Sequence, residues 1–186
     1  DAAIEITDAR NVTIENVTIE SCTRGIYLEN VDTCLINACR ATGNTGSGIR
    51  LSECSEVTVT GCSCEGNGDG IYVYGTGATI MDNACWDNED GGIYVGGGDA
   101  PVVTGSNVVN NGGKGLQVLG TNATIDDNTA DGNDIGLWVG GARGSVISDN
   151  TLVNNMYNFG VRQERDDLSH YQFTVRDTTA DGKPVR

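Results

Sequence analysis

Apolar and polar side chains alternate in short stretches that recur along the chain at a nearly constant interval. Each stretch opens with glycine and continues with an aliphatic residue, a variable residue and usually a second aliphatic residue, as in Gly70-Ile71-Tyr72-Val73. Alternation with a period of two predicts a strand whose aliphatic side chains point to one face and whose variable side chain points to the other. Seven glycines, 21 to 24 residues apart, open these stretches: Gly25, Gly48, Gly70, Gly92, Gly115, Gly136 and Gly160.

A second register of β-branched residues also recurs once per repeat and ends at Cys or Asn. In one repeat Thr79-Ile80 precedes Asn83, and a further asparagine, Asn88, follows before the next glycine. One repeat therefore reads as three short strands separated by turns. We expect one turn to stack Cys22, Cys39, Cys62, Asn83, Asn107, Asn128 and Asn150, and the next to stack Asn44, Asn67, Asn88, Asn111, Asn133 and Asn155. Stacked asparagines satisfy the buried backbone of such turns, so we assign them to the scaffold.

A repeat of about 22 residues with three strands predicts an all-β fold, a right-handed single-stranded parallel β-helix of about seven coils. Leucine-rich repeats have a similar period, but leucine is scarce here and no window shows helical spacing of apolar residues. At about 4.8 Å per rung, the coils would form a rod roughly 35 Å long. We assign residues 1–165 to the β-helix and residues 166–186 to a tail that caps it or begins the next segment of a longer chain.

The charge balance narrows the classes of partner. The chain has 26 acidic and 11 basic residues, a net charge of −15 and an isoelectric point near 4.1. Such a surface repels nucleic acid and anionic membranes, and no stretch of eighteen apolar residues predicts membrane insertion. An acidic, lysine-poor surface is typical of salt-adapted (halophilic) proteins, and it is equally compatible with an ordinary acidic extracellular surface.

The seven cysteines leave three alternatives open: packing thiols, a bridge within the Cys22/Cys39/Cys62 stack, or a soft-metal site. Cys62-Ser63-Cys64 lacks the spacing of a Cys-x-x-Cys motif. We expect Cys64 and Cys85 to share one small inward position with Ala41, Val109, Ala130 and Leu152. That position favours packing thiols.

The outward residue of each Gly-aliphatic-x-aliphatic stretch is the candidate for function, because its neighbours point into the core. Aromatic rings among hydrogen-bonding side chains suit a sugar chain, whose C–H faces stack on rings and whose hydroxyls need polar partners. Strand propensity alone, or a covering domain, would also explain such residues. The predicted carbohydrate-binding stripe comprises Tyr27, Arg50, Tyr72, Tyr94, Gln117, Trp138 and Arg162, with Tyr74 beside it.

Acidic residues form a second candidate site. Asp127 and Asp149 each precede a ladder asparagine on adjacent rungs, so their carboxylates could hold Ca²⁺ or act as an acid and a base at a glycosidic bond. Chance neighbours are also expected on so acidic a surface. Solvated turns account for the other acidic cluster, namely Asp69, Glu89, Asp90 and Asp134. Apart from calcium, the sequence predicts no cofactor.

The repeat, as seen in Thr79-Ile80-Met81-Asp82-Asn83 followed by Asn88 and Gly92-Ile93-Tyr94-Val95, resembles the β-helix repeat of carbohydrate-binding proteins, sugar hydrolases and NosD-type periplasmic copper-processing proteins. The resemblance covers residues 10–162. The tail, with Leu168-Ser169-His170-Tyr171 and Asp181-Gly182-Lys183-Pro184-Val185, is similar to a segment of secreted archaeal surface proteins of the NosD-like group. The resemblance departs from the enzymatic and copper branches, because no Asp-Pro-His segment occurs and the chain has one His and two Met.

We therefore expect a non-catalytic extracellular module of a cell-surface protein, structural or polysaccharide-binding. Its partner would be a polysaccharide or a surface protein, and it could associate with itself through the helix ends or the aromatic face. One alternative is a polysaccharide lyase, epimerase or glycoside hydrolase with its groove on that face. A second alternative is a lattice, stalk or filament element. An enzyme needs a groove with perturbed carboxylates, whereas a binding module needs exposed aromatic rings.

Overall fold

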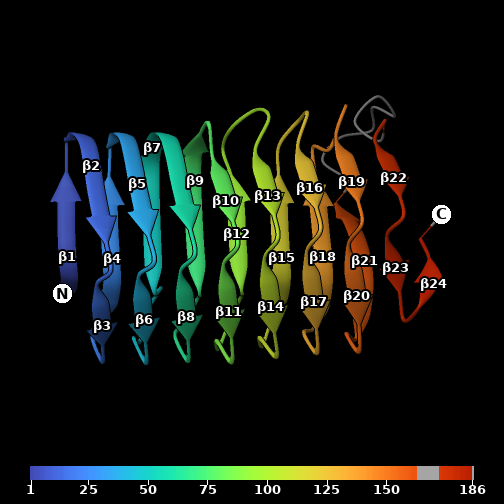
Figure 1. Ribbon diagram of the computed structural model, residues 1–186, viewed down its shortest axis with the longest axis horizontal. Coiled ribbons are helices and arrows are strands. Elements are labelled where there is room, and N and C mark those ends of the chain that lie inside the picture. The colour runs from blue at the N-terminus through green and yellow to red at the C-terminus, as the bar shows by residue number, and fades with distance from the viewer. Residues whose placement is uncertain (163–171, 186) are drawn as a thin grey trace.

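The chain winds into a parallel β-helix whose coils stack side by side along one axis (Figure 1). The computed structural model describes residues 1–162 and 172–185. Each coil contributes strands to three faces, and consecutive coils pair in parallel about 22 residues apart. The predicted all-β, right-handed β-helix of about seven coils is confirmed.

The first face, called face A, carries the Gly-aliphatic-x-aliphatic stretches. It is formed by β1 (Ala2–Thr7), β4 (Arg24–Glu29), the first half of β7 (Ile49–Thr60), β9 (Ile71–Thr76), β12 (Ile93–Gly96), β15 (Lys114–Leu119), β18 (Ile135–Gly140) and β21 (Tyr157–Arg162).

The other two faces complete each coil. Face B is formed by β2 (Arg10–Glu15), β5 (Asp32–Asn37), the second half of β7, β10 (Thr79–Met81), β13 (Val102–Thr104), β16 (Thr124–Asp126), β19 (Val146–Ser148) and β22 (Thr174–Arg176). Face C is formed by β3 (Thr18–Glu20), β6 (Arg40–Thr42), β8 (Ser63–Glu65), β11 (Ala84–Trp86), β14 (Asn107–Val109), β17 (Thr129–Asp131), β20 (Thr151–Val153) and β23 (Thr179–Ala180). Finally, β24 (Lys183–Pro184) pairs antiparallel with β23.

The core is a column of side chains from all three faces. In one coil Ile71, Ile80 and Cys85 meet there, each fully buried. Burying an aliphatic side chain of this size contributes about 1.5–3 kcal/mol, and each rung repeats that contribution against its neighbours. The expected inward position of Cys64 and Cys85 is confirmed, but its next member is Val108 and not Val109, which faces outward.

The recurring glycine marks a close approach between coils. A Cβ atom on Gly25 would lie 2.2 Å from the carbonyl oxygen of Gly48, and one on Gly70 would lie 2.5 Å from that of Gly92. Any side chain here would therefore push two coils apart. In the pairing of β21 with β18, Phe159 lies beside Leu137 and Gly160 lies beside Trp138. The seventh glycine is therefore not equivalent to the others.

Two asparagine ladders line the turns, as predicted. Asn67 accepts a hydrogen bond from the backbone N–H of Asn44 (3.1 Å), and Asn88 accepts one from that of Asn67 (2.9 Å). The predicted membership was wrong at two residues. Cys22 belongs to this ladder, since its N–H donates to Asn44 (2.9 Å), and Ser106 fills the place expected for the exposed Asn107.

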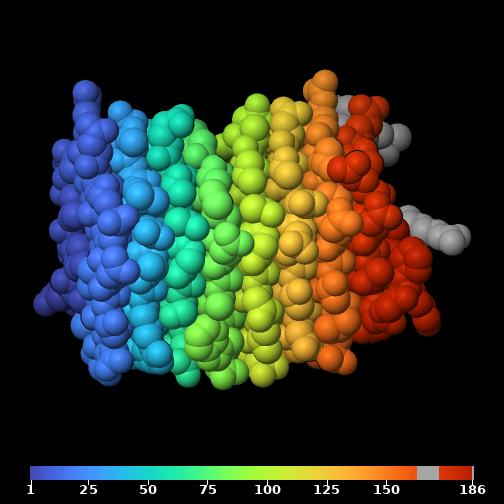
Figure 2. Space-filling view, viewed as in Figure 1, coloured from blue at the N-terminus to red at the C-terminus, as the bar shows by residue number. Residues whose placement is uncertain are grey.

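The coils form uninterrupted bands in the space-filling view (Figure 2). At the C-terminal end, Phe173 packs beside Phe159 with ring centroids 6.5 Å apart, and β22 and β23 extend the sheets beyond β19 and β20. The division at residue 165 stays a prediction, and Leu168 to Tyr171 lie outside the described residues. No helix in the described part of the chain is long and apolar enough to cross a membrane.

Candidate functional site

Face A carries the predicted stripe as one row of outward side chains, each partly exposed. Strand pairing places Tyr72 between Arg50 and Tyr94, and Gln117 between Tyr94 and Trp138. The row begins at Tyr27, which pairs with Arg50. These six residues lie together as expected, while their role in binding sugar stays a prediction.

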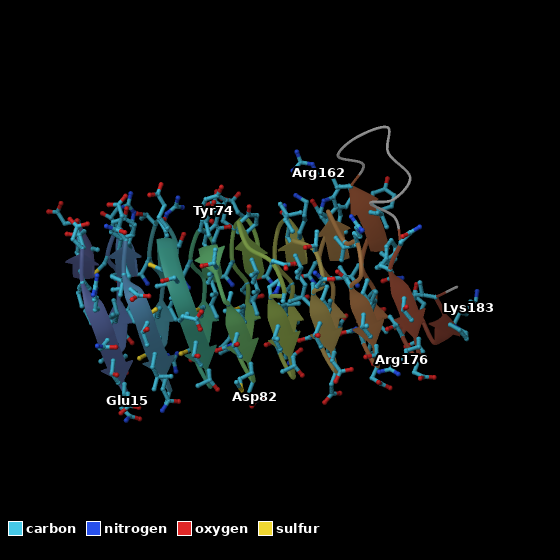
Figure 3. All side chains as sticks on the ribbon, turned by 90° about the horizontal axis from the view of Figure 1, so that it is seen from above. Glu15, Tyr74, Asp82, Arg162, Arg176 and Lys183 are labelled. Atoms are coloured by element: carbon cyan, nitrogen blue, oxygen red, sulfur yellow. The ribbon has the colours of Figure 1, made fainter. Side chains whose placement is uncertain are left out.

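The placement of Arg162 in this row was wrong. Gly160 follows Trp138 in the row, and Arg162 pairs with Gly140, two positions further along the strand. Tyr74 likewise lies two positions past the row, since it follows Tyr72 by two residues on β9 and pairs with Gly96. Tyr74 is 47% exposed. Figure 3 shows Tyr74 and Arg162 on one side of the molecule and Asp82 on the other.

The two central rings of the row, Tyr72 and Tyr94, stack on one another. The Tyr72 and Tyr94 centroids are 4.5 Å apart with an interplanar angle of 9°, and the Arg50 guanidinium carbon lies 4.3 Å from the Tyr72 centroid. Both faces of Tyr72 are therefore covered. A sugar can reach the edge and the hydroxyl group of Tyr72 but cannot stack on its face, so Tyr72 is not an open platform.

Two depressions flank Tyr94, and together they are called the Tyr94 groove. The first has a volume of about 390 Å³ and lies over the turns that precede the strands of face A. It is lined by Asp69, Tyr72, Asp90, Tyr94, Lys114 and Gln117. The second, of about 460 Å³, lies beyond the other ends of these strands and is lined by Tyr74, Tyr94, Asp99, Leu119 and Thr121. The groove thus follows the direction of β12, across the rod axis.

Glycines create the room for this groove. Gly91 and Gly113 line the first depression, whereas Gly97, Gly98, Gly120 and Gly141 line the second. A Cβ atom on Gly96 would lie 2.7 Å from the hydroxyl oxygen of Tyr94, so the ring extends over a residue without a side chain. The backbone therefore forms much of the floor, and Tyr94 stands between the two depressions.

The carboxylates of the groove differ in their surroundings. Burial raises the pKa of Asp69, and nearby Asp90 raises it further, while the N–H of Gly91 donates to Asp69 Oδ1 (3.2 Å) and opposes the shift. The pKa of Asp99 is lowered, because its carboxylate accepts hydrogen bonds from the Thr121 hydroxyl and from Asn122 Nδ2 (2.9 Å). Burial also raises the pKa of Tyr94.

The prediction for the acidic turns was incomplete, since it treated Asp69 as solvated. The structure makes Asp69 half-buried and adds Asp90, Asp99 and Lys114 to the site. The run Gly96-Gly97-Gly98-Asp99 was the available signal, because three side chains are missing where other repeats continue a strand.

Asp127 and Asp149 lie in exposed turns between faces B and C. Both adopt a left-handed backbone, with φ of 53° and 55°, which Asp, Asn and Gly tolerate better than other residues. Backbone conformation is sufficient to explain this acidic row. Within residues 1–162 and 172–185, no three His, Cys, Asp or Glu side chains are grouped as a metal site would need. Calcium at this pair stays a prediction.

Several solved structures share this architecture. The periplasmic alginate epimerase AlgG has a TM-score of 0.63 and 12% identity, with 89% of this chain and 50% of AlgG covered. The A-module of the Azotobacter vinelandii mannuronan C-5 epimerase AlgE4 has a TM-score of 0.65 and 14% identity, with 95% and 62% covered. The corresponding AlgE6 module has a TM-score of 0.53 and 16% identity, with 95% and 65% covered.

The chain therefore spans between half and just under two thirds of these structures, and identities this low show the shared fold alone. No curated protein matches its sequence. The sequence profile described as right handed beta helix region matches residues 2–155 and 69–182. With the stacked coils, the glycine row and the asparagine ladders already in view, this match shows that the chain belongs to the right-handed β-helix family.

Proposed function

We propose that this chain is a non-catalytic polysaccharide-binding module of an extracellular or cell-surface protein, and that its glycan lies in the Tyr94 groove. The observation that carries the proposal is the pair of depressions, of about 390 and 460 Å³, that meet at one tyrosine. Volumes of this order are typical of sites for small ligands, here a few sugar units of a longer chain.

The chemistry of the groove suits hydroxyl-rich ligands. Gln117 offers an amide, Tyr74 and Tyr94 offer hydroxyl groups, and Asp69 and Asp99 offer carboxylate oxygens that accept hydrogen bonds. The exposed ring of Tyr74 offers an apolar surface for the C–H groups of a sugar. Because glycines form much of the floor, a flexible chain can lie along the direction of β12 from one depression to the other, in contact with residues of the neighbouring coils.

The fold neighbours act on alginate and on mannuronan, both polysaccharides, which supports the polysaccharide class as the ligand of this chain. An extracellular location is proposed with it, since polysaccharides of this kind lie outside the cytoplasm. The acidic, lysine-poor surface supports a salt-tolerant source. Kinship with NosD-like archaeal surface proteins rests on the tail motif, of which Leu168 to Tyr171 lie outside the described residues.

A polysaccharide-active enzyme is the second candidate, and one observation favours it. Asp69 is half-buried with a raised pKa, and it lines the same depression as Lys114 and Tyr94. A carboxyl group of this kind can act as a general acid or base when substrate lies within reach. The predicted Asp127 and Asp149 pair is not part of this depression.

The test is affinity electrophoresis of the purified chain in gels that contain soluble neutral or acidic polysaccharides, with the Tyr94→Ala and Tyr27→Ala variants alongside. Tyr27 lies in the same outward row but outside both depressions, so it is a matched control. We expect retardation of the wild type and of Tyr27→Ala, and its loss in Tyr94→Ala. Assays for new reducing ends and for unsaturated products accompany each gel.

Product release that disappears in Asp69→Asn would replace the binding proposal with the enzymatic one. Equal retardation of all three proteins would mean that the glycan binds elsewhere on the rod. If no polysaccharide retards the wild type, the aromatic row is a contact surface of a lattice or stalk.

A further inference from the structure

Carboxylates stand at both ends of the Tyr94 groove. Asp69 and Asp90 line the first depression, and Asp99 lines the second. Within the described residues, none of the three forms an ion pair. The ion pair found there joins Arg40 to Glu65 (3.0 Å) on face C. Asp69 Oδ1 already accepts a hydrogen bond from Gly91, and Asp99 Oδ1 accepts bonds from Thr121 and Asn122. A carboxylate has about four acceptor sites, so each group keeps capacity to accept hydrogen bonds from a ligand.

The cations near the groove are directed to aromatic rings. The Arg50 guanidinium carbon lies 4.3 Å from the centroid of Tyr72, and Lys114 Nζ lies 5.8 Å from that of Trp138. Arg162 lies on β21, three strands away from β12, and does not line either depression, although its charge opposes the rise that burial causes in the pKa of Tyr94. Among the described residues, Lys114 is the single Lys or Arg that lines the depressions, so the groove has no pair of cations of the kind that binds the carboxylate of each successive uronate unit.

The whole chain adds to this local bias. Its net charge of −15 creates a negative potential that a polyanion must enter, while an uncharged chain does not experience that repulsion. Sugar hydroxyl groups donate hydrogen bonds readily to carboxylates, so the same acidic groups that repel a uronate attract a neutral sugar.

We propose that the Tyr94 groove selects an uncharged glycan and disfavours a polyuronate with the same backbone. This inference rests on the proposed function, and it departs from the acidic polysaccharides that the fold neighbours act on. Asp69, Asp90 and Asp99 are the residues that impose the selection, and they do so as acceptors for hydroxyl groups and as like charges against carboxylates.

The experiment uses oligosaccharides that differ only in the group on C5. Binding of β-1,4-mannohexaose and of the corresponding hexamannuronate is measured by isothermal titration calorimetry, and cellohexaose is compared with its hexaglucuronate in the same way. We expect the neutral member to bind at least about tenfold more tightly in low salt. Added sodium chloride should leave neutral binding nearly constant and strengthen uronate binding, because salt screens the repulsion.

Two matched triple variants separate the groove from the overall charge. The first triple combines Asp69→Asn, Asp90→Asn and Asp99→Asn, and it should remove most of the preference for the neutral glycan. The second triple, Asp82→Asn, Asp127→Asn and Asp149→Asn, removes the same charge from exposed left-handed turns between faces B and C, where asparagine is also tolerated. Figure 3 shows Asp82 on the side of the molecule opposite Tyr74. Equal effects of the two triples would show that selection comes from net charge and not from the groove.

A uronate that binds as tightly as its neutral partner would overturn the inference and leave the binding function intact. Failure of all four oligosaccharides, together with failure in the gels of neutral and acidic polysaccharides, would overturn the binding function itself. The wild-type comparison decides the question even if a triple variant folds poorly.

Discussion

The ring of Tyr72 lies parallel to that of Tyr94, with centroids 4.5 Å apart and an angle of 9° between the planes. Because the two residues are paired on adjacent strands, the rings stack along the rod axis at about the spacing of the rungs. Such a pair contributes about 0.5–1.5 kcal/mol beyond its burial. The stack therefore holds Tyr94 upright between the two depressions, and the regular pairing of coils fixes the centre of the groove.

Gly96→Ala should disturb the groove more than the fold. The added methyl would lie 2.7 Å from the Tyr94 hydroxyl oxygen and 3.0 Å from its ring carbon Cζ, and both belong to a side chain that can move. We expect a change in unfolding free energy within about 1 kcal/mol and a loss of glycan affinity, as the ring leaves its place beside Tyr72. Thermal unfolding and calorimetric titration measure the two effects.

Gly120→Ala is the contrasting variant. Its methyl would lie 2.5 Å from the carbonyl oxygen of Gly98, which is backbone, so we expect a loss of about 1–3 kcal/mol in stability. If Gly96→Ala proves to be the less stable of the two, the ring does not occupy the position described.

Ser106→Ala should destabilise the fold, and Asn107→Ala should not. Ser106 is buried, and its hydroxyl oxygen accepts a hydrogen bond from the N–H of Asn83 (3.3 Å), whereas Asn107 is exposed. Leaving that buried N–H without a partner costs about 1–3 kcal/mol, while an exposed substitution changes stability by about 0.5 kcal/mol or less. Urea unfolding midpoints of the two variants provide the comparison. The reverse order would restore the ladder assignment made from sequence.

That ladder error shows what the repeat could and could not predict. The three-strand coil, the glycine row and the second ladder follow from stacking, which imposes the same residue type at the same place in every coil. Ser106 occupies the ladder position that other coils fill with Asn or Cys, and Asn107, one residue later, has the residue type expected there. Cys22 was recoverable, because it precedes Gly25 by the same short interval that separates Asn67 from Gly70.

The sequence also contained a signal that Arg162 does not continue the outward row of face A. Gly136 lies beside Asn158 in the next coil, and a Cβ atom on Gly136 would lie 2.7 Å from the carbonyl oxygen of Asn158. This coil therefore keeps the usual length, and Gly160 does not occupy the position of the earlier glycines. The longest interval in the glycine series was the warning. The groove, in contrast, depends on glycines in three neighbouring coils acting together, and no single repeat reveals that Asp69 is half-buried.

Stability should depend on pH through Asp69 and Asp99 with opposite signs. Burial raises the pKa of Asp69 in the folded chain above its ordinary value of 3.8, so folding favours the protonated form. Its contribution is fully present below that value and is lost as the pH rises through the folded pKa. Asp69→Asn removes the loss, so the variant should gain thermal stability relative to the wild type as the pH is raised from 3 to 7.

The pKa of Asp99 is lowered, because Thr121 and Asn122 donate hydrogen bonds to its carboxylate. Its contribution is therefore present above the ordinary value of 3.8 and is lost as the pH falls. Asp99→Asn should be less stable than the wild type at pH 7, and the difference should shrink toward pH 3. Unfolding temperatures at a series of pH values test both variants, and parallel curves for the two would contradict the assignment.

The cysteines should differ sharply in reactivity. Burial raises the pKa of Cys34 and of Cys62 to about 12, and six of the seven thiols are buried while Cys22 is half-buried. The thiolate is the reactive form, so at pH 8 buried thiols of this kind react very slowly. We expect iodoacetamide to label Cys22 first in the folded chain and all seven cysteines in denaturant, as peptide mass spectrometry would show.

Fewer than seven labelled sites in denaturant without reductant would instead reveal a disulfide. The stacked Cys39 and Cys62 are the first pair to examine in that case, since the backbone nitrogen of Cys39 already lies 3.4 Å from Cys62 Sγ.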